Sequence, residues 1–212
     1  MQNNKGYYIA VEGLEGAGKS TAMKTIKKYL IQNNIDYIIA REPGATVVGE
    51  TIRQILKDSS ANDAMDARTE LLLFYAARIE LLEKIIKPAL RAGKCVLSDR
   101  FELSSFAYQG GGRKLDEKML HSLSDFCVAS CKPDLVLFLD ISPEVGLERA
   151  KRRGKLDRIE QESTDFFNRV HASYHNHLKN LVNVEIIDAT KPLVAVQKII
   201  REKLENAISP VI

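Results

Sequence analysis

The stretch GLEGAGKS, residues 13–20, decides the fold, because it fits the phosphate-loop pattern G-x-x-x-x-G-K-[ST]. The apolar run Tyr8–Val11 before it is short and partly β-branched, which predicts a buried strand. Residues 22–31 after it place apolar side chains at helical spacing. A glycine-rich turn that matches by chance is the alternative, and the predicted strand and helix on either side argue against it.

Each part of this loop has a predicted chemical task. Its glycines let the backbone approach phosphate oxygens, and the amide N–H groups at the start of the helix face the same anions. We expect Lys19 to reach the β- and γ-phosphates and the Ser20 hydroxyl to ligate Mg²⁺. The loop residues predicted to bind ATP are Gly13, Leu14, Glu15, Gly16, Ala17, Gly18, Lys19, Ser20 and Thr21.

Composition predicts one domain over residues 1–212, because this length with 45% hydrophobic residues supports a sizeable core. The net charge of +3 does not indicate a nucleic-acid binder. The longest apolar run, Leu71–Ala77, is far too short to span a membrane. Three cysteines without a C-x-x-C spacing predict reduced thiols and a cytoplasmic location.

Short apolar runs alternate with helical patterns along the chain. Strands are predicted near 8–11, 37–40, 95–97, 135–140 and 184–187, and helices near 48–57, 67–91, 115–130 and 160–181, after Pro143 and from Leu193. The glycine-rich segment 109–113 is predicted to be a loop. The order predicts an α/β fold of the P-loop NTPase type, with a parallel five-stranded sheet covered by helices on both faces. Ligands are then expected beyond the carboxyl ends of the strands.

Two acidic residues, Asp99 and Asp140, end apolar strands, where P-loop proteins place the carboxylate that holds Mg²⁺ directly or through water. We prefer Asp99, because Arg100 follows it and adds a fork for phosphate in the same turn. A turn carboxylate without a metal role is the alternative for Asp99. Arg41 also follows a strand, so we expect Arg41, Asp99, Arg100 and Asp140 to line one crevice with the phosphate loop.

Arg78 lies in the middle of an apolar helical stripe, which is costly for a charge without a partner. Phe74, one turn earlier, offers a flat ring beside it. A ring for stacking and a guanidinium for hydrogen bonds together suit a nucleobase. A structural salt bridge, for example to Glu70, is the alternative for Arg78.

The first half of the same helix is apolar all round, so one face packs on the sheet and the other needs a different cover. A second subunit is the simplest explanation, and we predict a homodimer.

A basic segment near residues 149–160 predicts a short arginine-rich lid with a hinge at Gly154. Its basic residues are Arg149, Lys151, Arg152, Arg153, Lys155 and Arg158. A solvated helix face paired with Glu144 and Glu148 is the alternative. The four histidines, His121, His171, His175 and His177, show no metal pattern and are predicted to be surface residues.

Six segments together are far more specific than the phosphate loop alone: Glu12–Thr21, Arg41–Gly44, Thr69–Arg78, Asp99–Arg100, Ala107–Arg113 and Leu156–Glu160. With them, nearly the whole chain resembles the bacterial type of thymidylate kinase. The resemblance implies transfer of the γ-phosphoryl group of Mg·ATP to thymidine 5′-monophosphate (dTMP), a step toward dTTP and DNA replication.

The resemblance also assigns residues. Arg41 and Arg100 would grip the acceptor phosphate, and Glu15 would hold the sugar 3′-hydroxyl. Phe74 would stack on thymine, with Arg78, Ser104, Ser105, Tyr108 and Gln109 around base and sugar. The catalytic set would be Lys19, Asp99, Arg100 and Arg153, and Arg149 would assist at ATP. Because the phosphate loop has no basic residue besides Lys19, the lid arginines must supply the remaining positive charge at the transferring phosphoryl group.

Two departures from the family pattern border the acceptor site: Ala45 replaces a usual glycine, and Phe101 replaces a usual Tyr or His. A deoxynucleoside kinase is one alternative, but Arg41 and Arg100 favour a charged acceptor. A P-loop switch or partner-binding ATPase is another, but no guanine-reading Asn-Lys-x-Asp motif is present.

Overall fold

The computed structural model of the chain describes residues 6–58, 65–154 and 156–208. These residues form a five-stranded sheet in the order β2-β3-β1-β4-β5, with every neighbouring pair parallel. The predicted α/β architecture is therefore confirmed. The strands are β1 (Tyr8–Gly13), β2 (Tyr37–Arg41), β3 (Cys95–Asp99), β4 (Leu135–Asp140) and β5 (Val184–Asp188).

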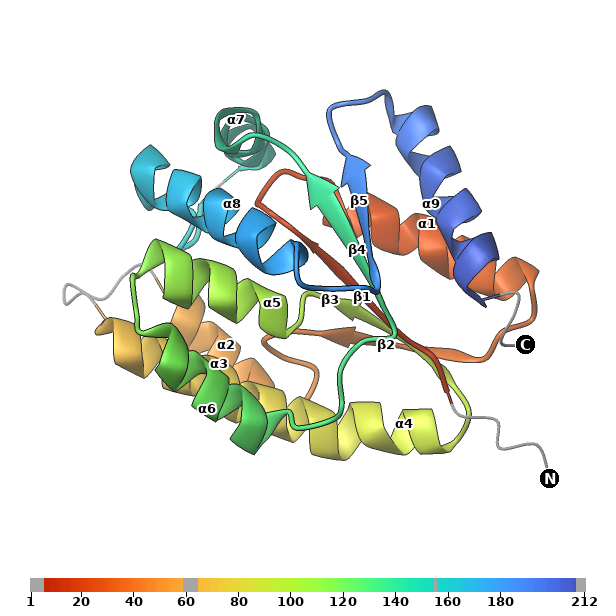
Figure 1. Ribbon diagram of the computed structural model, residues 1–212, viewed down its shortest axis with the longest axis horizontal. Helices are drawn as coiled ribbons and strands as arrows, with labels where there is room; N and C mark the ends of the chain where they lie inside the picture. Colours follow the sequence, from red (N-terminus) through yellow and green to blue (C-terminus); the bar gives the residue numbers. More distant parts are fainter. Residues whose placement is uncertain (1–5, 59–64, 155, 209–212) are drawn as a thin grey trace.

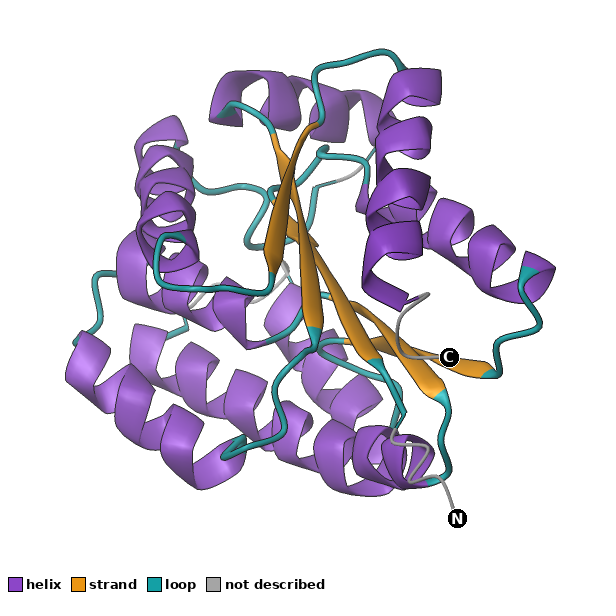
Figure 2. Cartoon of the chain, turned by 45° about the vertical axis from the view of Figure 1, so that its right-hand side comes forward, coloured by secondary structure: helices purple, strands orange, loops and turns teal. Residues whose placement is uncertain are grey.

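Helices cover both faces of the sheet, with α1 and α9 on one side and α3, α4 and α8 on the other (Figures 1 and 2). The α-helices are α1 (Lys19–Gln32), α2 (Val47–Lys57), α3 (Ala67–Leu81), α4 (Lys87–Arg91), α5 (Glu102–Ser105), α6 (Glu117–Cys127), α7 (Pro143–Arg153), α8 (Thr164–Leu178) and α9 (Leu193–Ile208). Two π-helical segments are η1 (Leu82–Ile86) and η2 (Phe106–Gly112).

Strand β1 is buried on both faces, as expected at the centre of a parallel sheet. Ile9 and Val11 pack in one core cluster with α1 and α9, whereas Tyr8 and Ala10 pack in another with α3 and η1. This central strand leads directly into the phosphate loop, so the core fixes the position of the loop.

The helix expected over residues 67–91 is confirmed as α3, η1 and α4 in succession. The π-helical segment η1 comes just before Pro88, which has no N–H to donate to a regular helical ladder. Among the described helices, none combines the length and the apolar character that a bilayer crossing requires.

The prediction of a loop at residues 109–113 is wrong, because Phe106–Gly112 form the π-helix η2. Two of its glycines, Gly111 and Gly112, allow close packing against α8. A Cβ atom on Gly111 would lie 2.4 Å from Ser173 Cβ, and one on Gly112 would lie 2.5 Å from the Phe166 ring. The sequence shows the glycines but not the helix that packs on them.

Candidate active site

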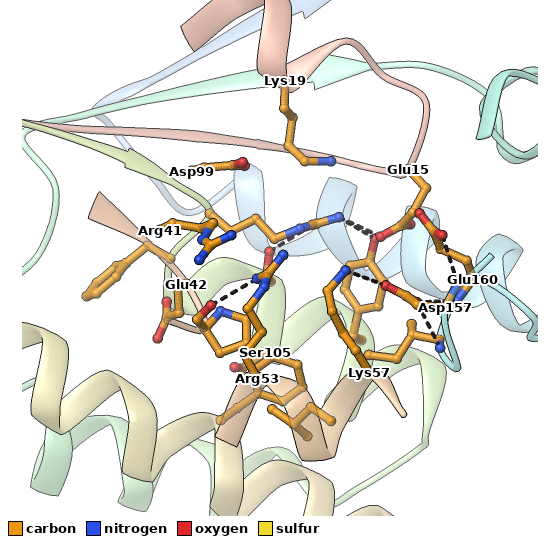
Figure 3. Close-up of a pocket in the computed structure, with 18 of the residues that line it drawn as sticks. Glu15, Lys19, Arg41, Glu42, Arg53, Lys57, Asp99, Ser105, Asp157 and Glu160 are labelled. Atoms are coloured by element: carbon orange, nitrogen blue, oxygen red, sulfur yellow. Dashed lines mark hydrogen bonds and ion pairs between the residues drawn. The ribbon is translucent and has the colours of Figure 1, made fainter. Parts of the chain in front are cut away.

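A cavity of about 610 Å³ opens at the carboxyl edge of the sheet, where the phosphate loop meets the ends of β2 and β3 (Figure 3). Its size is typical of a small-molecule site. The predicted residues that line it are Glu15, Gly16, Gly18, Lys19, Ser20, Arg41, Phe74, Arg78, Asp99, Arg100, Ser104, Ser105, Tyr108, Gln109, Arg149 and Arg153. Gly13, Leu14, Ala17 and Thr21 of the predicted set lie outside its lining.

The phosphate loop folds tightly between β1 and α1. Gly16 and Gly18 have φ angles of 73° and 94°, a region that glycine adopts without strain. The Lys19 ammonium lies inside this loop and donates to the carbonyl oxygens of Gly13 (2.9 Å) and Leu14 (2.8 Å). Burial, with the nearby Arg100 guanidinium, lowers the pKa of Lys19 to about 8. An anion beside this ammonium would stabilise its charged form.

Asp99 ends β3 next to β1, in register with Val11, and lines the cavity. Its Oδ1 atom is buried and has no hydrogen-bond partner among the described residues. An unsatisfied buried carboxylate oxygen is costly unless a ligand completes it. Lys19 and Asp99 project into the same part of the site (Figure 3).

The rival carboxylate, Asp140, ends β4 outside the cavity lining. Its Oδ1 atom lies 2.9 Å from His171 Nε2 and 3.2 Å from His175 Nε2. Both histidines are partly exposed, but the interpretation that no acidic ligand lies near them is wrong. Asp140 and His171 are separated by 31 positions in the chain, so only the fold brings them together.

Arg78 is 1% exposed and has a different ion-pair partner from the one considered in the sequence. Its Nε atom lies 2.5 Å from Glu42 Oε1, and its Nη2 donates to Ser105 Oγ at 2.8 Å. The proposed partner Glu70 instead accepts from other side chains. Arg78 Nη1 is buried and has no hydrogen-bond partner in the described part of the chain. One donor of the guanidinium is thus left beside the cavity, which the half-buried Phe74 also lines.

Arg100 and Glu15 form a partly buried ion pair in the cavity. Arg100 Nη2 donates to Glu15 Oε1 at 2.6 Å, and the Tyr108 hydroxyl donates to Glu15 Oε2 at 2.5 Å. Arg100 has a positive φ of 68°, which is uncommon for a residue with a side chain. The turn after β3 therefore holds this guanidinium against the phosphate loop.

Sequence reasoning missed Glu12, a fully buried residue near the end of β1. Its carboxylate accepts from Phe101 N (2.8 Å), Ser104 Oγ (2.6 Å) and the Tyr174 hydroxyl (3.0 Å). Burial raises the pKa of Glu12, and Arg100 opposes that shift. The contacts of Glu12 fix the turn that carries Arg100. One acidic residue in an otherwise apolar strand was the available signal.

Comparison with known proteins agrees with this geometry. Residues 11–200 match the family model described as thymidylate kinase. The chain is 52% identical over 208 residues to "Thymidylate kinase" of Legionella pneumophila (strain Corby), with 98% of each chain covered. It is 51% identical over 208 residues to "Thymidylate kinase" of Legionella pneumophila (strain Paris), again with 98% of each covered.

The chain belongs to the thymidylate kinase family.

In this family member, helix α2 adds basic residues to the cavity that the sequence did not single out. Arg53 and Lys57 both line it (Figure 3). Arg53 Nη1 donates to Pro43 O at 2.9 Å, and burial, together with the nearby Arg41 charge, lowers the pKa of Arg53. Arg41 itself is paired with Glu50, with 2.5 Å between Nη2 and Oε1. The amphipathic pattern of α2 predicted its helix but not which polar side chains face the site.

Helix α7 of the kinase packs directly on the phosphate loop. A Cβ atom on Gly16 would lie 2.1 Å from Gly146 O, and one on Gly146 would lie 2.6 Å from Glu15 O. Both glycines are therefore required by a close approach of two backbones. Because α7 carries Arg149 and Arg153, this contact sets both arginines relative to the loop.

The end of the lid is attached to α2 and α3. Lys57 Nζ lies 2.7 Å from Asp157 Oδ2, and Arg158 Nη2 lies 2.6 Å from Glu70 Oε2. Arg113 also donates to Glu70, with 2.9 Å between Nη2 and Oε2. The first two ion pairs hold Asp157 and Arg158 against these helices, and Asp157 lines the cavity.

The basic segment was interpreted either as a lid over the site or as a solvated helix face, and different residues fit each interpretation. Arg153 is paired with Glu160 at the cavity, and Arg152 is paired with Glu148 one turn away on the exposed face of α7. Gly154 ends α7 with a φ of 134°. Lys155 lies outside the described residues.

Proposed function

We infer that this kinase transfers the γ-phosphoryl group of ATP to dTMP and forms dTDP, which supplies dTTP synthesis. The observation that carries the inference is the juxtaposition, in one cavity, of a phosphate loop with a set of acceptor-side arginines. Membership of the thymidylate kinase family gives the identity of the two substrates. A neutral acceptor such as thymidine would give those arginines no phosphate to bind.

We propose that ATP lies along the phosphate loop, with Lys19 at the β- and γ-phosphates and Arg149 at the side of α7. The residues that would hold Mg²⁺ are Ser20 and Asp99, and the unsatisfied Oδ1 atom of Asp99 supports this assignment. Bound there, Mg²⁺ would neutralise charge on the phosphate oxygens. The amide groups of the loop add fixed donors for the same oxygens.

The nucleobase of dTMP is proposed to lie between Phe74 and the buried guanidinium of Arg78. The support is the Nη1 donor of Arg78, which is buried, unsatisfied and next to the cavity. Glu42 and Ser105 hold the other side of the same guanidinium in place. A planar donor held in this way discriminates between ring edges at low entropic cost. Gln109, which donates to Glu70 at 2.8 Å, completes this end of the site.

The acceptor phosphate is proposed to bind Arg41 and Arg100, as the sequence suggested, with Arg53 as an additional ligand. Arg41 is paired with Glu50, and Arg100 is paired with Glu15. When dTMP binds, its phosphate would replace these carboxylates as the partner of both guanidinium groups. Glu15 would then be available to accept the 3′-hydroxyl of the sugar, beside Tyr108. Ser104, bonded to Glu12, positions the Arg100 turn in this proposal.

Arg153 is the proposed lid arginine at the transferring phosphoryl group. Its ion pair with Glu160 places it at the cavity, and dissociation of that pair would free it for the γ-phosphate. The lid, near residues 149–160, is proposed to be part of a single domain of residues 1–212. An arginine supplied in this way contributes about 10³–10⁵ in rate.

A homodimer through α3 and a cytoplasmic location complete the proposal. On α3, Leu72 is 57% exposed and Ala76, one turn later, is also exposed, whereas Leu73 packs inward against the cluster around Ile52 and Leu56. A second subunit would cover this outward face.

The test is an assay of ATP with three acceptors: dTMP, thymidine and none. We expect ADP formation with dTMP alone, and dTDP as the second product. Equal or faster turnover of thymidine would indicate a deoxynucleoside kinase, and ADP formation without an acceptor would indicate an ATPase. Either result would overturn the proposal.

A further inference from the structure

Three metal-ligating side chains meet outside the cavity, at the end of β4 and on α8. Asp140 Oδ1 lies 2.9 Å from His171 Nε2 and 3.2 Å from His175 Nε2, and the two ring nitrogens are 3.2 Å apart. The histidines are four positions apart and therefore lie on the same face of α8. All three side chains are partly buried, and the His175 ring packs edge-on against Phe138.

The three atoms lie close enough together to be joined either by hydrogen bonds or by one bound cation. Each Nε2 atom carries at most one proton, so it can direct one hydrogen bond at most. The carboxylate oxygen can accept from both N–H groups, and a nitrogen without a proton offers a lone pair instead. A cation at the centre accepts a lone pair from all three atoms at once.

The separations also match the geometry of a transition-metal site. Zinc binds histidine nitrogen and carboxylate oxygen at about 2.0–2.2 Å, which places tetrahedral ligands about 3.3 Å apart. The three observed separations are close to that value, so α8 and β4 need not move for these atoms to bind one ion. Two imidazoles and one carboxylate suit Zn²⁺, whereas Mg²⁺ prefers oxygen ligands alone.

We propose that Asp140, His171 and His175 bind one divalent transition-metal ion of the zinc type. The site is separate from the Mg·ATP site, because none of the three residues lines the cavity. Glu144, in the first turn of α7, interacts electrostatically with His171 and adds negative charge nearby.

The position of this site gives the ion a structural role. The chain between Asp140 and His171 contains α7 and the lid, so the ion joins two residues that flank them. Helix α7 begins three residues after Asp140 and packs on the phosphate loop through Gly146. A metal ion bound to Asp140 and His171 closes the chain segment between them, which restricts the unfolded chain and so stabilises the folded one.

The test uses the full chain, treated with a chelator and freed of nucleotide and Mg²⁺, titrated with ZnCl₂ in a calorimeter. We expect one Zn²⁺ per chain, a higher Tm with Zn²⁺, and no comparable effect of MgCl₂. Co²⁺ in place of Zn²⁺ should give the visible absorption of a tetrahedral site. His171→Ala and His175→Ala should each weaken Zn²⁺ binding by about 100-fold or more.

Controls separate this site from other ligands. His121→Ala removes a histidine on α6, and Cys127→Ser with Cys131→Ser removes two thiols; these variants should bind Zn²⁺ as the wild type does. Asp140→Asn keeps the shape of the side chain and should also weaken binding, which covers the case in which a histidine variant does not fold. Absence of Zn²⁺ binding by the wild type would overturn the proposal. Binding that persists in folded Asp140→Asn and His175→Ala would overturn it as well.

Discussion

A single methyl group on α7 should disturb the ATP site, because Gly146 meets the phosphate loop backbone to backbone. In Gly146→Ala, the new Cβ atom would lie 2.6 Å from Glu15 O. An ordinary contact needs about 3.4 Å or more, so the helix or the loop must move by roughly 0.8 Å. Glu15 O is a backbone atom, which leaves no flexible side chain to absorb the change.

Two opposing free-energy terms set the magnitude. Alanine within a helix is favoured over glycine by about 1 kcal/mol, which raises stability. Overpacking costs about 1–3 kcal/mol, which lowers it, so the net loss of stability is about 0–2 kcal/mol. The effect on catalysis should be larger, because a displacement of about 1 Å in a catalytic group can cost about 10²-fold in rate. We expect kcat/KM for ATP to fall by roughly 10- to 100-fold.

The assay is initial velocity against ATP concentration, with dTMP affinity measured by calorimetry and Tm by circular dichroism. Binding of dTMP should weaken less than that of ATP, because Glu15 is its one proposed ligand on the phosphate loop, whereas Arg41, Arg100, Phe74 and Arg78 lie on other elements. Glu148→Ala, which places an alanine on the exposed face of the same helix, is the matched control and should keep wild-type kinetics. A Gly146→Ala enzyme with a higher Tm and an unchanged KM for ATP would refute the close-contact argument.

Three further predictions concern charge, stability and assembly. The pKa of Lys19 is about 8 in the free protein and should rise beside ATP, so ATP binding should take up a proton. Calorimetry in buffers of different ionisation enthalpy should show uptake of roughly three quarters of a proton at pH 8.5 and little at pH 6.5. No uptake at pH 8.5 would contradict this prediction. Glu70→Gln leaves the Arg158 guanidinium without its carboxylate, while Arg113 keeps only Glu162, and should cost about 3–5 kcal/mol. The loss should be seen as a Tm lower by roughly 6–20 °C, and a shift of less than about 3 °C would contradict it. Leu72→Glu should yield monomers in sedimentation while the exposed-site control Val182→Glu stays dimeric; a wild type that sediments as monomer at micromolar concentration would end the dimer proposal.

The elements that the sequence predicted well are those with a strong periodic pattern and a local start or stop signal. The phosphate loop between β1 and α1, and the helix that begins at Pro143, are examples. The segment 109–113 was mispredicted as a loop, because Gly111 and Gly112 are required by close packing against side chains of α8, more than 50 positions later in the chain. Packing between segments that are distant in the chain leaves no pattern in the local sequence.

The residues of the site were also predicted only in part. The rule that ligands gather at the carboxyl ends of parallel strands brought Arg41, Asp99 and Arg100 to one cavity correctly. It was wrong for Asp140, which ends β4 but does not line the cavity. Arg53 was missed, because a helix periodicity predicts which face is apolar and not which polar side chain faces a ligand. The partner of Arg78 was also misjudged: Glu70 is eight positions away in the chain, but the fold presents Glu42 instead.

The most direct test of the central claim is a single-turnover measurement of phosphoryl transfer from ATP to dTMP in the wild type and in Lys19→Ala. The claim is that this ammonium, set among the carbonyls of the phosphate loop, stabilises charge on the transferring group. We predict that the transfer rate falls by about 10²–10³-fold or more, while dTMP affinity stays within about threefold, or roughly 0.65 kcal/mol. A Lys19→Ala enzyme that forms dTDP at a near wild-type rate would contradict the account.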